Sequence, residues 1–373
     1  MRDVDAISST TKPKPKPGIV TWLTSTVGRI LVSLLVPVIT FLVLWRGFIF
    51  LRDSDAPQVV QVLVAIVWGV GGVALLYTVS NWLVEQLPKE WVRRIQPFVF
   101  VGPALAILAW YLVIPTFRTL FMSFQNDIST RFVGLDNFIF AFSDRIMLEA
   151  FRNNLLWMIF GTGFSVGLGL LIAVLADRTK AESIYKAIIF MPMAISFVGA
   201  GVIWGFVYHI DPDIGLLNAI ITSLGGTRVA FLQTVGLNTI LLIVVGIWIW
   251  TGFAMTILSA ALKGVPSEIL EAARVDGANE WTVFWQIIVP IIMPTITVVI
   301  TVMIINVLKV FDIVYVMTGG NYGTEVMANR MYTEMYINFN TGRGTAIAVV
   351  LILVIVPFMW LNVKRFQEQE AIR

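Results

Sequence analysis

Long runs of hydrophobic residues alternate with short polar segments along almost the whole chain. A helix that crosses a membrane needs about 20 predominantly apolar residues, and eight runs approach or exceed that length. They lie near residues 27–51, 58–84, 97–121, 151–176, 186–209, 236–262, 287–309 and 345–363. The pattern predicts an all-α, polytopic membrane protein with about eight transmembrane helices.

The composition supports this assignment and excludes several kinds of site. Hydrophobic residues make up 58% of the 373 residues and charged residues only 13%, whereas soluble globular proteins carry about 25% charged residues. The absence of cysteine excludes disulfides and thiolate metal sites, and a single histidine, His209, argues against a histidine-based zinc site. A net charge of +3 gives no reason to expect nucleic-acid binding.

The positions of lysine and arginine predict the orientation in the membrane. Cytoplasmic loops are enriched in these residues, and here they gather near the N-terminus and in the segments "PKEWVRRIQ", "DRTKAESIYK" and "VKRF". Residues 1–26 include the repeat "KPKPKPG", which does not form a helix, so we predict a basic cytoplasmic tail rather than a cleaved signal peptide. Both termini are therefore predicted to be cytoplasmic.

Two pairs of glycines have a spacing that favours close packing of membrane helices. They are Gly163 with Gly167 and Gly201 with Gly205. A small residue at every fourth position lets two helix backbones approach each other in lipid, so we predict that both pairs lie at helix–helix contacts.

Lys309 and Asp312 stand three residues apart at the outer end of the seventh apolar run. On a continuous helix this spacing places both side chains on one face. We expect a structural ion pair, with an ion-coupling site as the alternative.

The polar segment between the sixth and seventh runs, residues 264–290, has its own helical pattern. Ser267 is expected to be the N-cap of a short amphipathic helix that ends at Gly277, and Asn279 is expected to cap a second helix. The first helix has an alanine-rich face small enough to enter a groove on a partner protein. Glu271 and Asp276 would offer charges to lysine or arginine of that partner.

This segment resembles the EAA loop of ABC-importer permeases. The positions of the family motif are occupied here by Glu271, Ala272, Ala273, Asp276, Gly277 and Pro290. The resemblance implies that the short helix docks into a cytoplasmic ATPase and transmits its movement to the membrane helices. An ordinary amphipathic connector is the alternative.

The resemblance extends from about the third apolar run to the end of the chain. It is carried by segments such as "FVGLDNF", "RNNLLW", "KAIIFMPMAISFVGAGVIWGFVY" and "VFDIVYVMTGGNYGTEVMANRMY". These are most similar to permeases of the carbohydrate branch, in particular those for alpha-glucosides and glucosylglycerol, which are related to the larger maltose-permease subunit. Residues 122–150 are too short for the large periplasmic domain of the maltose protein, so its contacts with a binding protein cannot be transferred.

The same resemblance implies a domain organisation and a set of solute contacts. Residues 27–96 would form two additional helices, and residues 97–373 a six-span permease core. Solute contacts would come from the spans on either side of the EAA loop, at Ile249, Trp250, Phe253, Met303, Asn306 and Val307. An interhelical hydrogen bond is the alternative role for Asn306, and packing or lipid contact is the alternative for Trp250 and Phe253.

The resemblance also implies the partners of the chain. Because no G-x-x-x-x-G-K-[ST] phosphate-binding loop occurs in the sequence, ATP and Mg²⁺ would bind to separate subunits and this chain would hold no cofactor. The expected complex contains a second homologous permease, two ATPase subunits and an extracytoplasmic solute-binding protein in a bacterial inner membrane.

Two other classes of function remain as alternatives at this stage. An ion-coupled transporter would need titratable side chains in the middle of its spans, and the runs contain none of the expected chains of Asp, Glu and His. A membrane-embedded enzyme would need a cluster of catalytic side chains at one depth, and none is apparent.

Overall fold

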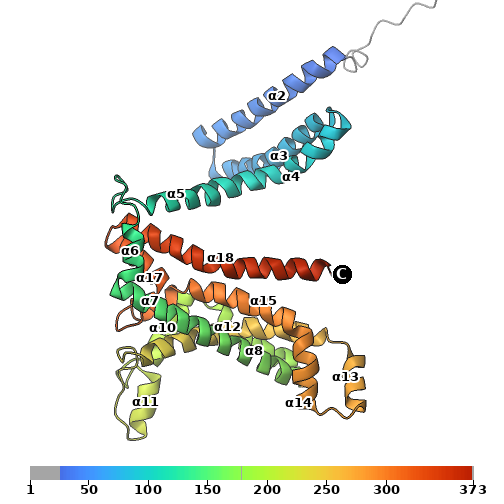
Figure 1. The fold of residues 1–373 in the computed structure, drawn as a ribbon. Coiled ribbons are helices and arrows are strands. Elements are labelled where there is room, and N and C mark those ends of the chain that lie inside the picture. The colour runs from blue at the N-terminus through green and yellow to red at the C-terminus, as the bar shows by residue number, and fades with distance from the viewer. Residues whose placement is uncertain (1–25, 178, 372–373) are drawn as a thin grey trace, which may run out of the picture. The chain divides into compact units, whose positions relative to one another are not determined.

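The computed structural model describes residues 26–177 and 179–371, and its regular secondary structure is helical (Figure 1). Within these residues no strand forms, and the only extended pairing is an isolated bridge between Gln125 and Phe132. The all-α prediction is therefore confirmed. Residues 1–25 of the predicted basic tail lie outside the described residues.

Among residues 26–177 and 179–371, seven helical segments are long and apolar enough to cross a membrane, and an eighth is counted if one bent pair forms a single span. The seven are Leu31–Asp53, Gln58–Glu85, Lys89–Met122, Arg145–Ala176, Leu237–Lys263, Glu280–Leu308 and Thr341–Lys364. This agrees with the prediction of about eight spans. It differs in the fifth predicted span, which is not one straight helix.

The fifth predicted span, residues 186–209, bends by 99°. Helix α9 (Glu182–Phe190) runs into a 3₁₀ turn, η3 (Met191–Ala194), that contains Pro192, and Ile195 and Ser196 are extended. The Ser196 hydroxyl then accepts a hydrogen bond from the Gly199 amide at 3.0 Å and starts α10 (Phe197–Val207) in a new direction. Proline interrupts the first helix and serine caps the second, which explains the bend.

The chain divides into two compact units between Ile114 and Pro115. The first unit contains α2 (Thr26–Asp53), α3 (Gln58–Glu85), α4 (Lys89–Leu108) and the π-helical turn η1 (Ala109–Val113). Trp68 of α3 donates a hydrogen bond to the Leu44 carbonyl of α2 at 3.1 Å, and Gln96 of α4 donates to the Asn81 side chain of α3 at 2.9 Å. Polar side chains thus join α3 to both of its neighbours.

Besides α9 and α10, the second unit contains short helices and the helices that form its core. They are α5 (Ile114–Met122, which begins at the boundary), α6 (Asp136–Ser143), α7 (Arg145–Leu156), α8 (Thr162–Ala176), α11 (Leu216–Ser223), α12 (Leu237–Lys263), α13 (Ser267–Val275), α14 (Glu280–Val283), α15 (Val289–Leu308), α16 (Asp312–Met317), α17 (Met327–Tyr332) and α18 (Thr341–Ala371). π-helical turns occur at η2 (Trp157–Gly161), η4 (Phe284–Ile288) and η5 (Thr333–Ile337).

Helix α12 lies at the centre of the second unit and packs against α8, α9 and α15. Its close neighbours are accommodated by glycine. A Cβ added to Gly169 of α8 would lie 2.7 Å from the Ala254 Cβ, and a Cβ added to Gly252 would lie 2.6 Å from the Ile189 carbonyl oxygen. These two glycines, rather than the predicted pairs, make the close backbone contacts.

The glycine-pair prediction is mostly wrong for contacts within this chain. A Cβ added to Gly163, Gly167 or Gly205 would meet no atom within 4 Å, because these positions face away from the neighbouring helices. Only Gly201 fits the prediction, since its added Cβ would lie 3.1 Å from a methyl group of Val316.

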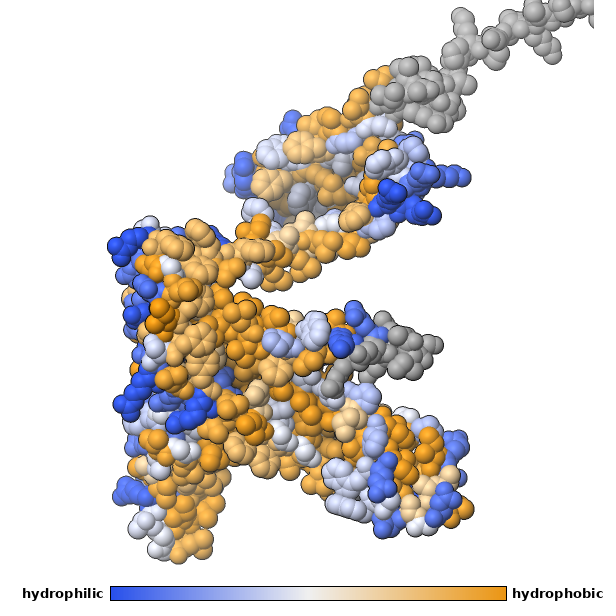
Figure 2. Space-filling model, viewed as in Figure 1, coloured by the Kyte–Doolittle hydropathy of each residue, from blue (hydrophilic) through white to orange (hydrophobic). Residues whose placement is uncertain are grey.

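The two ends of the second unit differ in structure. Helices α13 and α14 lie at one end, which we call the α13 end, and α6, α17 and the start of α7 lie at the opposite end (Figure 1). On the face seen in Figure 2, hydrophobic residues cover the length of the helices and hydrophilic residues gather towards both ends. This distribution is typical of a helical bundle that crosses a membrane.

Candidate functional site: an exposed loop helix and a polar pocket

Helix α13 projects from the bundle and leaves apolar side chains exposed. Its Ile269 and Val275 are 43% and 87% exposed, and Trp281 of α14 is 72% exposed. Exposed aromatic and aliphatic side chains on a short amphipathic helix are typical of a surface that docks into a partner. Leu270 points the other way and packs against the core.

The end of α13 has a tightly specified backbone. Gly277 adopts φ +86°, its amide donates to the Arg274 carbonyl at 3.1 Å, and the Ala278 amide donates to the Ala273 carbonyl at 3.0 Å. Together these two bonds form the Schellman motif, which needs a left-handed residue that glycine adopts without strain. The prediction that Gly277 ends the helix is confirmed.

Two side chains fix the turn that follows. The Asn279 side chain accepts a hydrogen bond from the Thr282 amide at 2.8 Å, as predicted, and so begins α14. The Arg274 Nε donates to the Glu280 carboxylate at 2.8 Å, and this hydrogen bond holds the pKa of Arg274 above its ordinary value. The prediction for the start of α13 is wrong by one residue, since Pro266 is the N-cap and Ser267 is already helical.

The turn is continuous with a membrane helix. From α14 the chain passes through η4 into α15, where Pro290 stands in the first turn and lacks an amide to donate. A π-helical turn directly before this proline widens the helix and accommodates the missing hydrogen bond. Helix α14, η4 and α15 therefore form one continuous helical path, which the turn after Gly277 joins to α13.

A network of charges joins α8, α9 and α12 at the α13 end. Lys186 contacts the carboxylates of Asp177, at 2.5 Å, and Glu182, and it also contacts the Ser259 hydroxyl. Lys263, the last residue of α12, contacts Glu182 at 2.5 Å. The base of α12, from which the α13 loop emerges, is thereby fixed to the α8–α9 connection.

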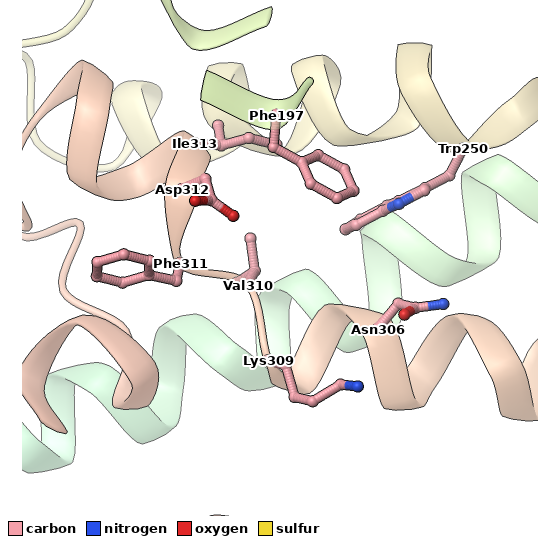
Figure 3. Close-up of a pocket in the computed structure, with 8 residues that line it drawn as sticks. All are labelled: Phe197, Trp250, Asn306, Lys309, Val310, Phe311, Asp312 and Ile313. Carbon is pink, nitrogen blue, oxygen red and sulfur yellow. The ribbon is translucent and has the colours of Figure 1, made fainter. Parts of the chain in front are cut away.

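A pocket of about 250 Å³ opens between α10, α12, α15 and α16 (Figure 3). Its lining residues are Phe197, Trp250, Asn306, Lys309, Val310, Phe311, Asp312 and Ile313. Figure 3 shows the rings of Phe197 and Trp250 next to each other, with Asn306 and Lys309 below them and Asp312 at about their level. Their centroids lie 6.0 Å apart in an edge-to-face arrangement. Aromatic rings beside amide, ammonium and carboxylate groups suit a ligand that has both an apolar face and hydroxyl groups.

The structure separates the six predicted solute contacts into two groups. Trp250 and Asn306 line the pocket, whereas Phe253 is half-buried and packs against the core. The other three are fully buried core residues that do not line the pocket: Ile249, Met303 and Val307. The Asn306 side chain is exposed and makes no hydrogen bond to another described residue, so the alternative of an interhelical bond is not seen within this chain.

The predicted ion pair between Lys309 and Asp312 is wrong. Helix α15 ends at Leu308, Lys309 is its C-cap, and Asp312 begins α16 after a break at residues 310 and 311. The two residues therefore do not share a helical face, and no ion pair joins them among the described contacts. Both instead line the pocket.

Comparison with known proteins gives the family to which the chain belongs. Residues 165–364 match the family model described as the inner membrane component of binding-protein-dependent transport systems. The chain is 56% identical over 279 residues to the osmoprotective compounds uptake permease protein GgtC of Synechocystis sp., a match that covers 74% of this chain and all of the relative. The chain belongs to this family of transport permeases.

Other relatives agree with the assignment. The permease is 46% identical over 277 residues to the alpha-glucoside transport system permease protein AglF of Rhizobium meliloti, covering 73% of the permease and 82% of the relative. A crystal structure of a bacterial alginate ABC transporter shares its fold, with a TM-score of 0.64 and 22% identity, over 74% of the permease and 94% of that chain. The predicted family and fold are thus confirmed.

Sequence reasoning missed six of the eight residues that line the pocket of this permease: Phe197, Lys309, Val310, Phe311, Asp312 and Ile313. Of these, Lys309 and Asp312 were expected only as an ion pair. Phe197 follows the Pro192 bend, which no hydrophobicity pattern reveals. Phe311 and Asp312 lie beyond the end of α15 and beyond the predicted run 287–309, where no solute contact was expected. A proline and a serine between two apolar stretches were the available signal for the first of these.

The loop between α16 and α17 contains a buried carboxylate that offers a test of stability. Glu325 is 6% exposed and accepts hydrogen bonds from Asn329 Nδ2 at 2.6 Å and the Val326 amide at 3.1 Å. Burial raises its pKa above the ordinary value, against the opposing effect of these hydrogen bonds and of Arg330, while Glu149 adds to the rise. Burial in the folded protein therefore disfavours the ionised carboxylate of Glu325 relative to its protonated form.

Glu325→Gln is expected to raise the unfolding temperature at pH 8, because glutamine keeps the oxygen acceptor and removes the buried charge. Because the pKa of Glu325 is raised in the folded state, the wild-type protein gains stability as the pH falls through that value towards the ordinary glutamate pKa of about 4.3. The advantage of the variant should accordingly shrink as the pH falls from 8 towards the ordinary pKa of a glutamate. Thermal unfolding of the detergent-solubilised permease checks this, and an advantage that grows on acidification would contradict it.

Proposed function

We propose that this permease imports a neutral sugar or sugar-like compatible solute, such as an alpha-glucoside, a disaccharide or glucosylglycerol. The observation that carries the proposal is the pocket in which Trp250 and Phe197 lie edge to face beside Asn306, Lys309 and Asp312. Aromatic faces suit the apolar side of a sugar ring, and the polar groups suit its hydroxyls. The names of the relatives, which refer to osmoprotective compounds and to alpha-glucosides, support the same class.

The proposed driving force is ATP hydrolysis by two separate subunits that bind ATP and Mg²⁺. Helix α13, with Glu271, Ala272, Ala273, Asp276 and Gly277, would dock into such a subunit, and Pro290 would lie on the path to α15. Its exposed side chains and its rigid C-terminal turn support this role. Closure of the ATPase pair would then pull α15, one wall of the pocket, and change the side from which the pocket is open.

The proposed complex also contains a second homologous permease and an extracytoplasmic solute-binding protein, in a bacterial inner membrane. The α13 end and both termini would be cytoplasmic, and the opposite end would receive the binding protein. Asn306 and Lys309 of the pocket are exposed in this chain, and the second permease would cover them. Residues 27–96 would add two helices to the six-span core of residues 97–373.

Transport by the reconstituted complex tests the function directly. We expect proteoliposomes with internal ATP, all partner subunits and liganded binding protein to accumulate labelled trehalose, sucrose or glucosylglycerol. Accumulation should persist when ionophores remove ion gradients and should stop without ATP. Uptake that needs an ion gradient but no ATP would contradict ATP-driven import, and ATP-driven uptake of other solutes alone would contradict the sugar class.

A further inference from the structure

Four aromatic rings lie in unbroken contact from the pocket towards the end of the unit opposite α13. Phe311, which lines the pocket, stacks on Tyr315 with ring centroids 5.1 Å apart and contacts Tyr332 at 5.3 Å. Tyr332 in turn contacts Tyr315 at 5.2 Å and Tyr336 at 5.1 Å. We call these four residues the aromatic track. In Figure 3 the Phe311 ring points away from Trp250, so the track leaves the pocket on that side.

Phe311 packs against a cluster of buried residues that includes Met327 and Ile347, but two other rings of the aromatic track are exposed. Tyr315 is 43% exposed and Tyr336 is 59% exposed, whereas Trp157 and Trp250, which form an aromatic pair inside the unit, are 0% and 6% exposed. The rings of Tyr315 and Tyr336 instead present faces that remain available to a ligand.

The backbone beneath the exposed rings is firmly held. Tyr332 and Tyr336 are four residues apart and so share one side of the α17–η5 segment. Glu334, from the same segment, is 1% exposed and pairs with Arg330 at 2.6 Å, while its carbonyl accepts from the Asn340 amide at 2.7 Å. One side of the segment is thus anchored, and the rings on the other side keep their positions without a ligand.

The chemistry of such a surface fits a glycoside. A sugar ring has an apolar face of C–H bonds, which packs on an aromatic ring, and equatorial hydroxyls, which can bond to tyrosine hydroxyls. Successive rings about 5 Å apart offer a ring-bearing solute overlapping contacts. A solute can then move from one ring to the next while losing only part of its contact at each step.

We propose that the aromatic track is a binding path for the glycosyl ring of the solute, which it guides into the pocket at Trp250 and Asn306. This inference rests on the proposed function. It adds a site outside the pocket and assigns it a ligand of defined chemistry, a neutral pyranoside. It also assigns Phe311 to both regions, as the point where the path enters the pocket.

The experiment measures how many solute molecules are imported per ATP hydrolysed. Proteoliposomes with the full complex and saturating liganded binding protein are compared for wild type, Tyr332→Ala and Tyr332→Phe, with labelled trehalose as the probe. Losing one ring should lower the solute imported per ATP about three- to tenfold, while binding-protein-stimulated ATP hydrolysis stays within a factor of two. Tyr332→Phe keeps the ring and should retain most of the wild-type ratio.

Two further variants separate a path for sugar from other roles. Tyr336→Ala should also lower the ratio, whereas Phe339→Ala, which removes a ring that is 76% exposed and outside the track, should not. An equal fall in uptake and ATP hydrolysis would overturn the proposal, because it would indicate a protein-docking surface or a folding defect. An unchanged ratio in both tyrosine-to-alanine variants would overturn it too. The proposed function fails separately, if the wild type shows no ATP-driven uptake.

Discussion

Gly277→Val is expected to reduce ATP-driven uptake about tenfold or more while leaving the permease folded in the membrane. The residue adopts φ +86°, where a β-branched side chain is strongly disfavoured. A strain of about 1–2 kcal/mol would open the Schellman turn and change the direction in which α13 projects. Uptake by cells or proteoliposomes that contain the complete importer, normalised to permease content, gives the measurement.

The same position offers a graded series. No atom lies within 4 Å of a Cβ added to Gly277, so the defect should follow backbone preference rather than size. Gly277→Asn should keep much of the activity, because asparagine tolerates the left-handed region. Gly225→Val is the matched control, since Gly225 has φ +82° and equally open surroundings, but lies after α11 away from α13. Equal loss of uptake in both valine variants would contradict a specific role for the α13 turn.

The α13 loop could be predicted from the sequence because its structure is local. Gly277, Asn279 and Pro290 each act on the residues next to them, through a left-handed turn, an N-cap and a missing amide. Such effects depend on residue type and spacing, which a sequence displays directly. The one-residue error at Ser267 is of the size that helix ends commonly show.

The pocket could be predicted only in part, because it depends on where helices stop and cross. Trp250 and Asn306 were found from a resemblance, yet Met303 and Val307 on the same helix as Asn306 turn into the core. The direction of each side chain is set by the crossing of α12 and α15, which hydrophobicity does not encode. The ion-pair prediction failed for a related reason, since it assumed that the helix continues from Lys309 to Asp312, whereas α15 ends at Leu308.

The glycine pairs illustrate the same difference between local and tertiary information. Gly163 and Gly167 have the spacing of a packing motif, but the contact with α12 is made by Gly169, two residues further on. Two residues correspond to roughly half a turn of helix, so they lie on opposite sides of α8. Spacing alone identifies a stripe of small residues without identifying the neighbour that it faces.

Asn306→Leu is expected to lower ATP-driven sugar uptake about tenfold with little change in stability. The side chain faces the pocket beside Lys309 and makes no hydrogen bond to another described residue, so leucine of similar size leaves no partner unsatisfied. A solute hydroxyl would lose its amide partner, and an unmatched polar group in a binding site costs about 1–3 kcal/mol. Thr297→Val on the same helix is the control, because its hydroxyl bonds only to the Met293 carbonyl one turn earlier. Uptake rates and unfolding temperatures of both variants decide the matter: full activity of Asn306→Leu would remove this amide from the solute site, and a lowered unfolding temperature would reassign it to folding.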